Sequence, residues 1–273
     1  MLRRAINVTY VETDGRAARE GTVVTNFAGR LRSREQLIGY WVSSDNPPMT
    51  ERLARLGYDY LNIDVQHGMI DYQGVLHGLM AVDTGTAAGV VRVPGNDPVW
   101  IGRALDAGAQ AIIVPLVDTA EEAAAAVRAC RYPPHGRRSF GPVRSVLRIG
   151  PTPAEANEAV ACIVMIETES GLANLSDICA VPGVDAVYVG PSDLALAVGA
   201  ARPQDGPGLP AFEDALKLIV ATAEAAGIGA GLHCPDGEAA ARALGRGFTF
   251  VSISNDLNHL TAVATEHLRR ARG

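Results

Sequence analysis

The chain has 273 residues, of which 48% are hydrophobic and 20% charged, and its formal net charge is −6. This composition is typical of a globular protein with a large core and excludes a disordered chain. No basic cluster with interleaved aromatic residues occurs, and no apolar run reaches the roughly 18 residues that cross a bilayer. The composition therefore disfavours nucleic-acid and membrane partners and favours a small ligand.

The cysteines and the first residues of the chain indicate the cellular compartment in which the protein is expected to fold. No two cysteines have CxxC spacing, and most lie in apolar or Ala-rich stretches, which predicts buried thiols in a reducing cytoplasm rather than disulfides or a zinc site. The first four residues carry two arginines but no apolar segment follows them, so we expect no secretory signal. The four cysteines are Cys130, Cys162, Cys179 and Cys234.

Eight short apolar runs bounded by Gly, Pro or Asp predict strands. Most of them lack the polar alternation of a one-sided sheet, which is typical of parallel strands that are buried on both faces. In chain order, the predicted strands are residues 37–42, 60–65, 90–93, 111–114, 162–166, 186–189, 228–232 and 248–253.

Helix signals alternate with these runs. Asn96 or Asp97 can cap a helix that has Pro98 in its first turn and stops at Gly108. The stretch DTAEEAAAAVRAC, residues 118–130, has the spacing of a capping box, and residues 209–227 form a third amphipathic pattern. Eight strands that alternate with helices predict an α/β fold, a (β/α)8 TIM barrel.

The length of the chain and its unpatterned segments bear on the domain organisation. A doubly wound open sheet is the alternative fold, but it would normally have fewer strands and a Gly-rich first turn, which is missing. Residues 1–25 precede the first repeat and are expected to form an N-terminal extension, while residues 26–273 form a single catalytic domain. The segments 132–154 and 199–210 are long for plain connections, which is typical of functional loops.

Acidic residues follow two predicted strands directly. Glu167 ends the stretch VMIETES, and Asp193 lies in GPSDLA, after the next strand. Because active-site residues of such barrels gather at the carboxyl ends of strands, the two carboxylates are expected to meet, and a divalent cation would offset their repulsion. An oxygen site of this kind suits Mg²⁺, Mn²⁺ or Co²⁺. The alternative is that each acid only caps the following helix.

A histidine and an arginine follow other strand ends. His67 is a candidate general base, and Asp64 and Asp106 could orient it or supply charge. The alternative is that His67 is an ordinary loop residue. Arg92 interrupts the apolar stretch VVRV, so its guanidinium must meet either an internal acid such as Asp64 or an anionic ligand.

Two further features concern the substrate. Gly190 and Pro191 force a sharp exit from a strand, and backbone N–H groups near Ser192 and Asp193 are candidates for binding a carboxylate. Lys217 is the single lysine, and it falls in a predicted helix rather than at a strand end. A Schiff-base mechanism therefore has no suitable nucleophile.

The motifs GYWVSS, YDYLNIDVQHG, VRVPGNDP, VMIETESGLANL and GVDAVYVGPSDLALAVG, at this spacing, resemble the HpcH/HpaI aldolase family. The resemblance runs from about residue 26 to the end of the chain. It implies a barrel of the phosphoenolpyruvate/pyruvate-binding type and a class II, metal-dependent pyruvate aldolase, similar to the 4-hydroxy-2-oxoheptanedioate aldolases.

By this resemblance, Glu167 and Asp193 bind the metal and Arg92 contacts the developing enolate oxygen. His67, with Asp64 and Asp106 behind it, is the base for the 4-hydroxyl proton. The resemblance also implies a hexamer, a trimer of dimers with exchanged last helices, in which Asp106 reaches a neighbour's site. Gln66 stands where some members of the family have Glu, and Met165 stands where some have Gln. These two departures concern the choice of substrate and the reaction rate rather than the type of reaction.

The expected activity is reversible cleavage of a 4-hydroxy-2-oxo acid into pyruvate and an aldehyde through a metal-stabilised pyruvate enolate, in the catabolism of aromatic compounds or sugar acids. Rival interpretations are an oxaloacetate decarboxylase, a macrophomate-synthase-like enzyme and a CoA-ester lyase, for which the arginines of residues 132–154 are the candidate CoA patch. A non-catalytic keto-acid-binding module is a more distant alternative.

Overall fold

A computed structural model describes residues 26–150 and 152–273, and the predicted extension, residues 1–25, lies outside them. Eight parallel strands pair in sequence order and close into a barrel, β1 with β8, which confirms the predicted (β/α)8 architecture. The strands are β1 Leu37–Val42, β2 Tyr60–Asp64, β3 Ala88–Arg92, β4 Ala111–Val114, β5 Ala161–Ile166, β6 Ala186–Val189, β7 Gly229–Cys234 and β8 Phe250–Asn255.

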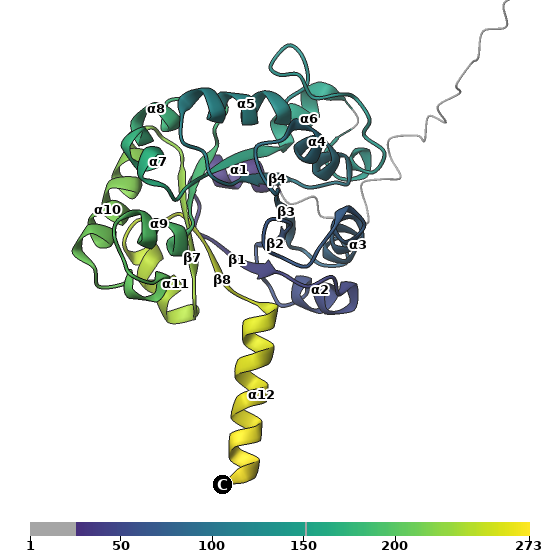
Figure 1. The fold of residues 1–273 in the computed structure, drawn as a ribbon. Coiled ribbons are helices and arrows are strands. Elements are labelled where there is room, and N and C mark those ends of the chain that lie inside the picture. Colours follow the sequence, from purple (N-terminus) through teal and green to yellow (C-terminus); the bar gives the residue numbers. More distant parts are fainter. Residues whose placement is uncertain (1–25, 151) are drawn as a thin grey trace, which may run out of the picture.

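Helices surround the barrel (Figure 1). The α-helices are α1 Phe27–Arg32, α2 Pro47–Ala54, α3 Tyr72–Val82, α4 Pro98–Asp106, α5 Ala120–Cys130, α6 Pro153–Ala159, α7 Glu169–Ala173, α8 Leu175–Cys179, α9 Pro191–Ala197, α10 Pro210–Ala225, α11 Gly237–Gly245 and α12 Asp256–Arg272. Two 3-10 helices, η2 Ser145–Leu147 and η3 Pro203–Asp205, lie inside the long connections.

The expected helix signals are present. Asp97 caps α4 with Pro98 at its start, and Gly108 just beyond its end has a φ of 106°, which glycine adopts at little cost. Thr119 and Glu122 form the predicted capping box of α5. All four cysteines are free and buried, as predicted.

The barrel has two apolar layers. An inner cluster fills its centre, where α1 closes the end opposite the site by burying Phe27 and Leu31. A larger cluster lies between the strands and the surrounding helices, with every residue of β2 to β6 buried. Burial on both faces explains why the strands appear in the sequence as unbroken apolar runs.

Five strands differ from the predicted bounds. β2 ends at Asp64 rather than at residue 65, β3 lies at Ala88–Arg92 rather than at 90–93, and β5 begins at Ala161 rather than at 162. The strand predicted at 228–232 extends to Cys234, and that predicted at 248–253 lies at Phe250–Asn255. The apolar pattern placed both ends too early because polar residues interrupt it before the strands end. Of these, His233 and Asn255 line the cavity, whereas Cys234 at the end of β7 is buried in the larger apolar cluster. Among the described residues, no helix is long and apolar enough to cross a membrane.

The last helix stands apart from the barrel. Figure 1 shows α12 projecting away from the other elements, and Asp256 is its one buried residue. Leu260, Val263 and Leu268 are more than half exposed on it. A single chain thus leaves the apolar residues of this helix in water.

Candidate active site

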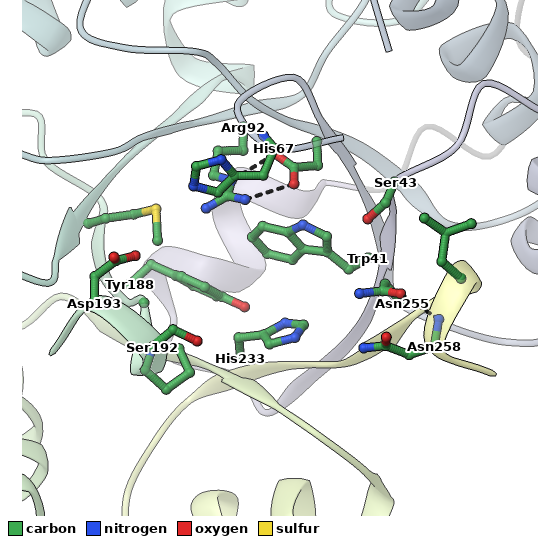
Figure 2. A pocket seen from close by; sticks show the side chains of 15 residues that line it. Trp41, Ser43, His67, Arg92, Tyr188, Ser192, Asp193, His233, Asn255 and Asn258 are labelled. Atoms are coloured by element: carbon green, nitrogen blue, oxygen red, sulfur yellow. Dashed lines mark hydrogen bonds and ion pairs between the residues drawn. The ribbon is translucent and has the colours of Figure 1, made fainter. Parts of the chain in front are cut away.

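A cavity of about 310 Å³ opens at the carboxyl ends of the strands (Figure 2). Most of the predicted site residues line it: Asp64, His67, Arg92, Gly190, Pro191, Ser192 and Asp193. Side chains to which the sequence interpretation gave no catalytic or binding role complete the lining: Trp41, Ser43, Met165, Tyr188, His233, Asn255, Leu257 and Asn258.

Asp64 and Arg92 form the buried ionic centre of the cavity. The register of β2 and β3 places them side by side, and Arg92 donates to both carboxylate oxygens, from Nε at 2.8 Å and from Nη2 at 2.7 Å. Burial alone would raise the pKa of Asp64, but the hydrogen bonds and charge of Arg92 outweigh it and lower that pKa. The internal ion pair that the sequence offered as one alternative for Arg92 is therefore present.

Arg92 retains capacity for a ligand. Its Nη1 has no hydrogen-bond partner among residues 26–150 and 152–273, and its guanidinium carbon lies 4.9 Å from the centre of the Trp41 ring. The ion pair and the ring together hold the guanidinium at the wall of the cavity.

Asp64 contacts the backbone of His67 and not its imidazole ring, which the sequence had suggested it would orient. Its backbone N–H is 3.4 Å from Asp64 Oδ1, while the imidazole itself is exposed at the mouth of the cavity. Within one chain, Asp64 therefore positions the backbone of this histidine and leaves its ring without a carboxylate partner among the described residues.

Asp106 lies away from the cavity of its own chain. It ends α4, and its carboxylate accepts a hydrogen bond from Arg138 at 2.6 Å. Burial raises the pKa of Asp106, although the adjacent Arg138 opposes that effect. The structure of one chain does not bring Asp106 to His67.

Glu167 is a buried carboxylate with one oxygen unpaired. It is 2% exposed, and Oε1 accepts a hydrogen bond from the backbone N–H of Leu116 at 2.9 Å. Oε2 has no hydrogen-bond partner within the described part of the chain. Leu116 has a φ of 55°, a conformation unfavourable for leucine, and it is this residue that donates to Glu167. Burial, with the nearby charge of Asp193, raises the pKa of Glu167.

Gly190, which lines the cavity, packs directly against this carboxylate. A Cβ atom at position 190 would lie 2.1 Å from Glu167 Oε2, so any other residue there would displace the carboxylate. Because β5 pairs with β6, Glu167 and Asp193 follow adjacent strands, as predicted. Glu169 lies in the first turn of α7 and is exposed, which agrees with its interpretation as a helix-start acid.

These residues fit a divalent cation. Among residues 26–150 and 152–273, no group of three or more His, Cys, Asp or Glu side chains converges as a complete metal site. Mg²⁺ and similar ions are commonly bound by one or two carboxylates, with water and substrate as the other ligands. The unpaired Oε2 of Glu167, beside a second acid, is a donor set of that kind.

His233 is a partly buried histidine at the end of β7. Burial, and then the positive charge of Arg92, lower its pKa from 6.5 to about 4. An unfolded chain takes up a proton at this histidine as the pH falls below 6.5, but the folded chain does so only near pH 4. The histidine's contribution to stability is thus complete above pH 6.5 and is lost progressively down to about pH 4.

We therefore expect His233→Gln to reduce the acid sensitivity of the fold. Between pH 6.5 and 4, the free energy of unfolding of the wild type should fall by up to about 3 kcal/mol more than that of the variant. Urea denaturation at several pH values measures both. Parallel pH profiles for the two proteins would contradict the expectation.

Comparisons with known proteins identify a family of similar chains. A profile of the family described as HpcH/HpaI aldolase/citrate lyase matches residues 37–262. A hydroxypyruvate/pyruvate aldolase of Rhizorhabdus wittichii is 41% identical over 85% of this chain and 92% of its own length. A 2-dehydro-3,6-dideoxy-6-sulfogluconate aldolase of Pseudomonas putida is 36% identical over 89% and 95%.

A solved structure supports the same relationship. The crystal structure of an HpcH/HpaI aldolase/citrate lyase family protein from Burkholderia cenocepacia has 32% sequence identity and a TM-score of 0.81, covering 90% of this chain and 99% of the other.

Proposed function

This chain belongs to the HpcH/HpaI aldolase/citrate lyase family and is an aldolase, and we propose that it reversibly cleaves a 4-hydroxy-2-oxo acid into pyruvate and an aldehyde with the help of a divalent metal ion. The buried Oε2 of Glu167, which has no hydrogen-bond partner among the described residues, carries the proposal. It packs against Gly190, which lines the cavity together with Arg92 and Asp193. Residues 26–273 would form the single catalytic domain.

Glu167 and Asp193 would hold the cation, for which Mg²⁺, Mn²⁺ and Co²⁺ are the candidates. When bound, the ion would supply positive charge where the enolate oxygen develops during cleavage. The keto acid's carboxylate would meet the backbone N–H groups of Ser192 and Asp193, which precede the first backbone hydrogen bond of α9, from Leu194 to Gly190.

Arg92 would stabilise the same developing charge from the other side. Asp64 engages its Nε and Nη2, which fixes the plane of the guanidinium and leaves Nη1 for the substrate oxygen. A donor that is positioned before the reaction lowers the barrier because no reorganisation is needed as the charge appears.

His67 would accept the proton of the 4-hydroxyl group. Its exposed imidazole lies at the mouth of the cavity, and Asp64 holds its backbone through the N–H group. Asp106 would act on the imidazole of a neighbouring subunit, because it does not line the cavity of its own chain.

Carbanion stabilisation by a lysine finds no support. Lys217 lies on α10, outside the barrel, where it is exposed and pairs with Asp214 at 2.8 Å. Three of the four arginines of the predicted CoA patch are engaged in internal ion pairs: Arg138 with Asp106, and Arg144 and Arg148 with Asp83. Arg137 is exposed, and one exposed arginine makes a weak case for a CoA patch.

The exposed apolar residues of α12 and the position of Asp106 support a homo-oligomer, with a hexamer as the expected form. Light scattering of the purified protein measures its mass. An active monomer would contradict both the oligomer and the role of Asp106.

The test of the proposed function is pyruvate release by metal-stripped protein before and after the addition of Mg²⁺ or Mn²⁺. Cleavage of a 4-hydroxy-2-oxo acid should require the metal and should be much faster than decarboxylation of oxaloacetate. Reaction with oxaloacetate alone would assign the protein as a decarboxylase, and metal-independent cleavage would remove the metal from the proposal.

A further inference from the structure

One wall of the cavity is polar and uncharged, and the proposed mechanism does not use it. It is formed by His233 at the end of β7, Asn255 at the end of β8 and Asn258 in the first turn of α12. Figure 2 shows these three side chains together, with Asp193 on the opposite side of the cavity. We call them the amide wall.

The ring of His233 is held in one orientation. The register of β7 and β8 places it beside Ser252, whose Oγ lies 3.1 Å from Nδ1. The edge of the imidazole also packs against Trp41, with ring centres 5.2 Å apart and planes at 70°. These contacts leave Nε2 without a partner among the described residues, in a side chain that lines the cavity.

A buried tyrosine sets which ring nitrogen carries the hydrogen. Tyr188 is fully buried, and its hydroxyl contacts the Ser252 hydroxyl. It reaches Ser252 across Gly231, where a Cβ atom would lie 2.5 Å from the Tyr188 ring. Ser252 is the hydrogen-bond partner that the described residues offer to this hydroxyl.

Each hydroxyl has one hydrogen to donate. If Tyr188 donates to Ser252, then Ser252 donates to Nδ1 of His233, and the hydroxyl hydrogens of Tyr188 and Ser252 both have an acceptor. In the reverse direction the Tyr188 hydrogen would have no acceptor among the described residues. The favoured arrangement makes Nδ1 an acceptor and leaves the hydrogen on Nε2.

The two asparagines add further groups to the amide wall. Asn255 caps α12 by accepting the backbone N–H of Asn258 at 2.8 Å, which leaves its NH₂ group available. The Asn258 side chain is exposed and offers both a donor and an acceptor. Arg92 is the one permanently charged cation among the residues that line the cavity, and Asp64 already engages it.

From this geometry we propose that the amide wall binds a hydroxyl group on the aldehyde half of the substrate, with Nε2–H of His233 as the principal donor. The proposal rests on the proposed aldolase function and names its substrate class, a short hydroxylated aldehyde. An apolar aldehyde would leave this N–H without a partner. An aldehyde with a terminal carboxylate would find no free cation at the amide wall among the described residues of the chain.

The test compares two aldehydes of equal heavy-atom count, glycolaldehyde and propanal, in addition reactions with pyruvate and Mn²⁺. We expect the wild-type kcat/KM to favour glycolaldehyde at least about tenfold, and His233→Leu to reduce that preference at least about tenfold. His233→Gln retains an N–H donor and should preserve part of the preference. His77→Leu, on an exposed face of α3, is the matched control and should leave the preference unchanged.

Several outcomes would overturn the proposal. An unchanged preference in His233→Leu, or a wild type that prefers succinic semialdehyde to glycolaldehyde, removes the amide wall as a hydroxyl site while the aldolase function stands. No addition of pyruvate to any of these aldehydes by the wild type overturns the proposed function itself. If His233→Leu does not fold, Asn258→Leu, at an exposed position, provides the same readout and should reduce the preference about threefold.

Discussion

Glu167→Gln is expected to lower kcat for cleavage of a 4-hydroxy-2-oxo acid by at least about 1,000-fold. The amide has nearly the same shape as the carboxylate but lacks the negative charge that holds a divalent cation. Losing the transition-state stabilisation of such an ion costs about 4 kcal/mol or more, which corresponds to this factor in rate. Steady-state kinetics at saturating Mn²⁺ and calorimetric titration with Mn²⁺ measure the two effects.

The variant should remain folded. The glutamine oxygen can still accept the hydrogen bond from Leu116. The substitution also removes a buried carboxyl group whose pKa is raised by burial and by the charge of Asp193. We expect the free energy of unfolding of the metal-free protein to be unchanged or higher by about 1 kcal/mol. A large loss of stability would mean that reduced activity says nothing about the metal.

Glu169→Gln is the matched control for this substitution. Glu169 lies two residues further along the chain, is exposed and belongs to the first turn of α7. Its replacement should leave Mn²⁺ affinity unchanged and alter stability by no more than about 0.5 kcal/mol. Full activity and unaltered Mn²⁺ affinity in Glu167→Gln would remove the metal site from the proposal.

Arg92→Met is expected to lower both stability and activity. Asp64 is 2% exposed and would keep its buried carboxylate without the guanidinium, which costs about 3 to 5 kcal/mol of unfolding free energy at neutral pH. The loss of a positioned donor at the enolate oxygen should reduce kcat about 100-fold to 1,000-fold. Urea denaturation and single-turnover kinetics separate the two effects.

The stability loss in Arg92→Met should depend on pH in a defined direction. In the wild type the pKa of Asp64 is lowered, so its favourable contribution is present above the unfolded value of about 3.8 and is lost as the pH falls through the folded value. In the variant, burial without Arg92 raises that pKa, so protonation relieves the unpaired charge as the pH falls. The stability difference between the two proteins should therefore shrink from pH 7 towards pH 4.

A double variant tests the catalytic part separately. Arg92→Met combined with Asp64→Asn removes both charges and should recover most of the lost stability, while the cleavage rate stays low. If the double variant regained wild-type activity, Arg92 would have no role at the reacting oxygen.

The sequence by itself determined the barrel and most of the site. Strands buried on both faces produce apolar runs, and Thr119, Asp97 and Gly108 mark helix ends through contacts with residues a few positions away. Because polar residues at the carboxyl ends of barrel strands face one cavity, Arg92 and Glu167 could be assigned to the site from their place in the chain.

Only the tertiary structure decided which groups pair within that cavity. The register of β2 and β3 directs Asp64 to Arg92 rather than to the His67 ring, and Leu116 donates to Glu167 from 51 residues away. The hydroxyl contact from Tyr188 to Ser252, which orients His233, joins residues 64 positions apart across Gly231. Local patterns encode burial and chain direction, but these contacts exist only once the barrel has closed and fixed the register of its strands.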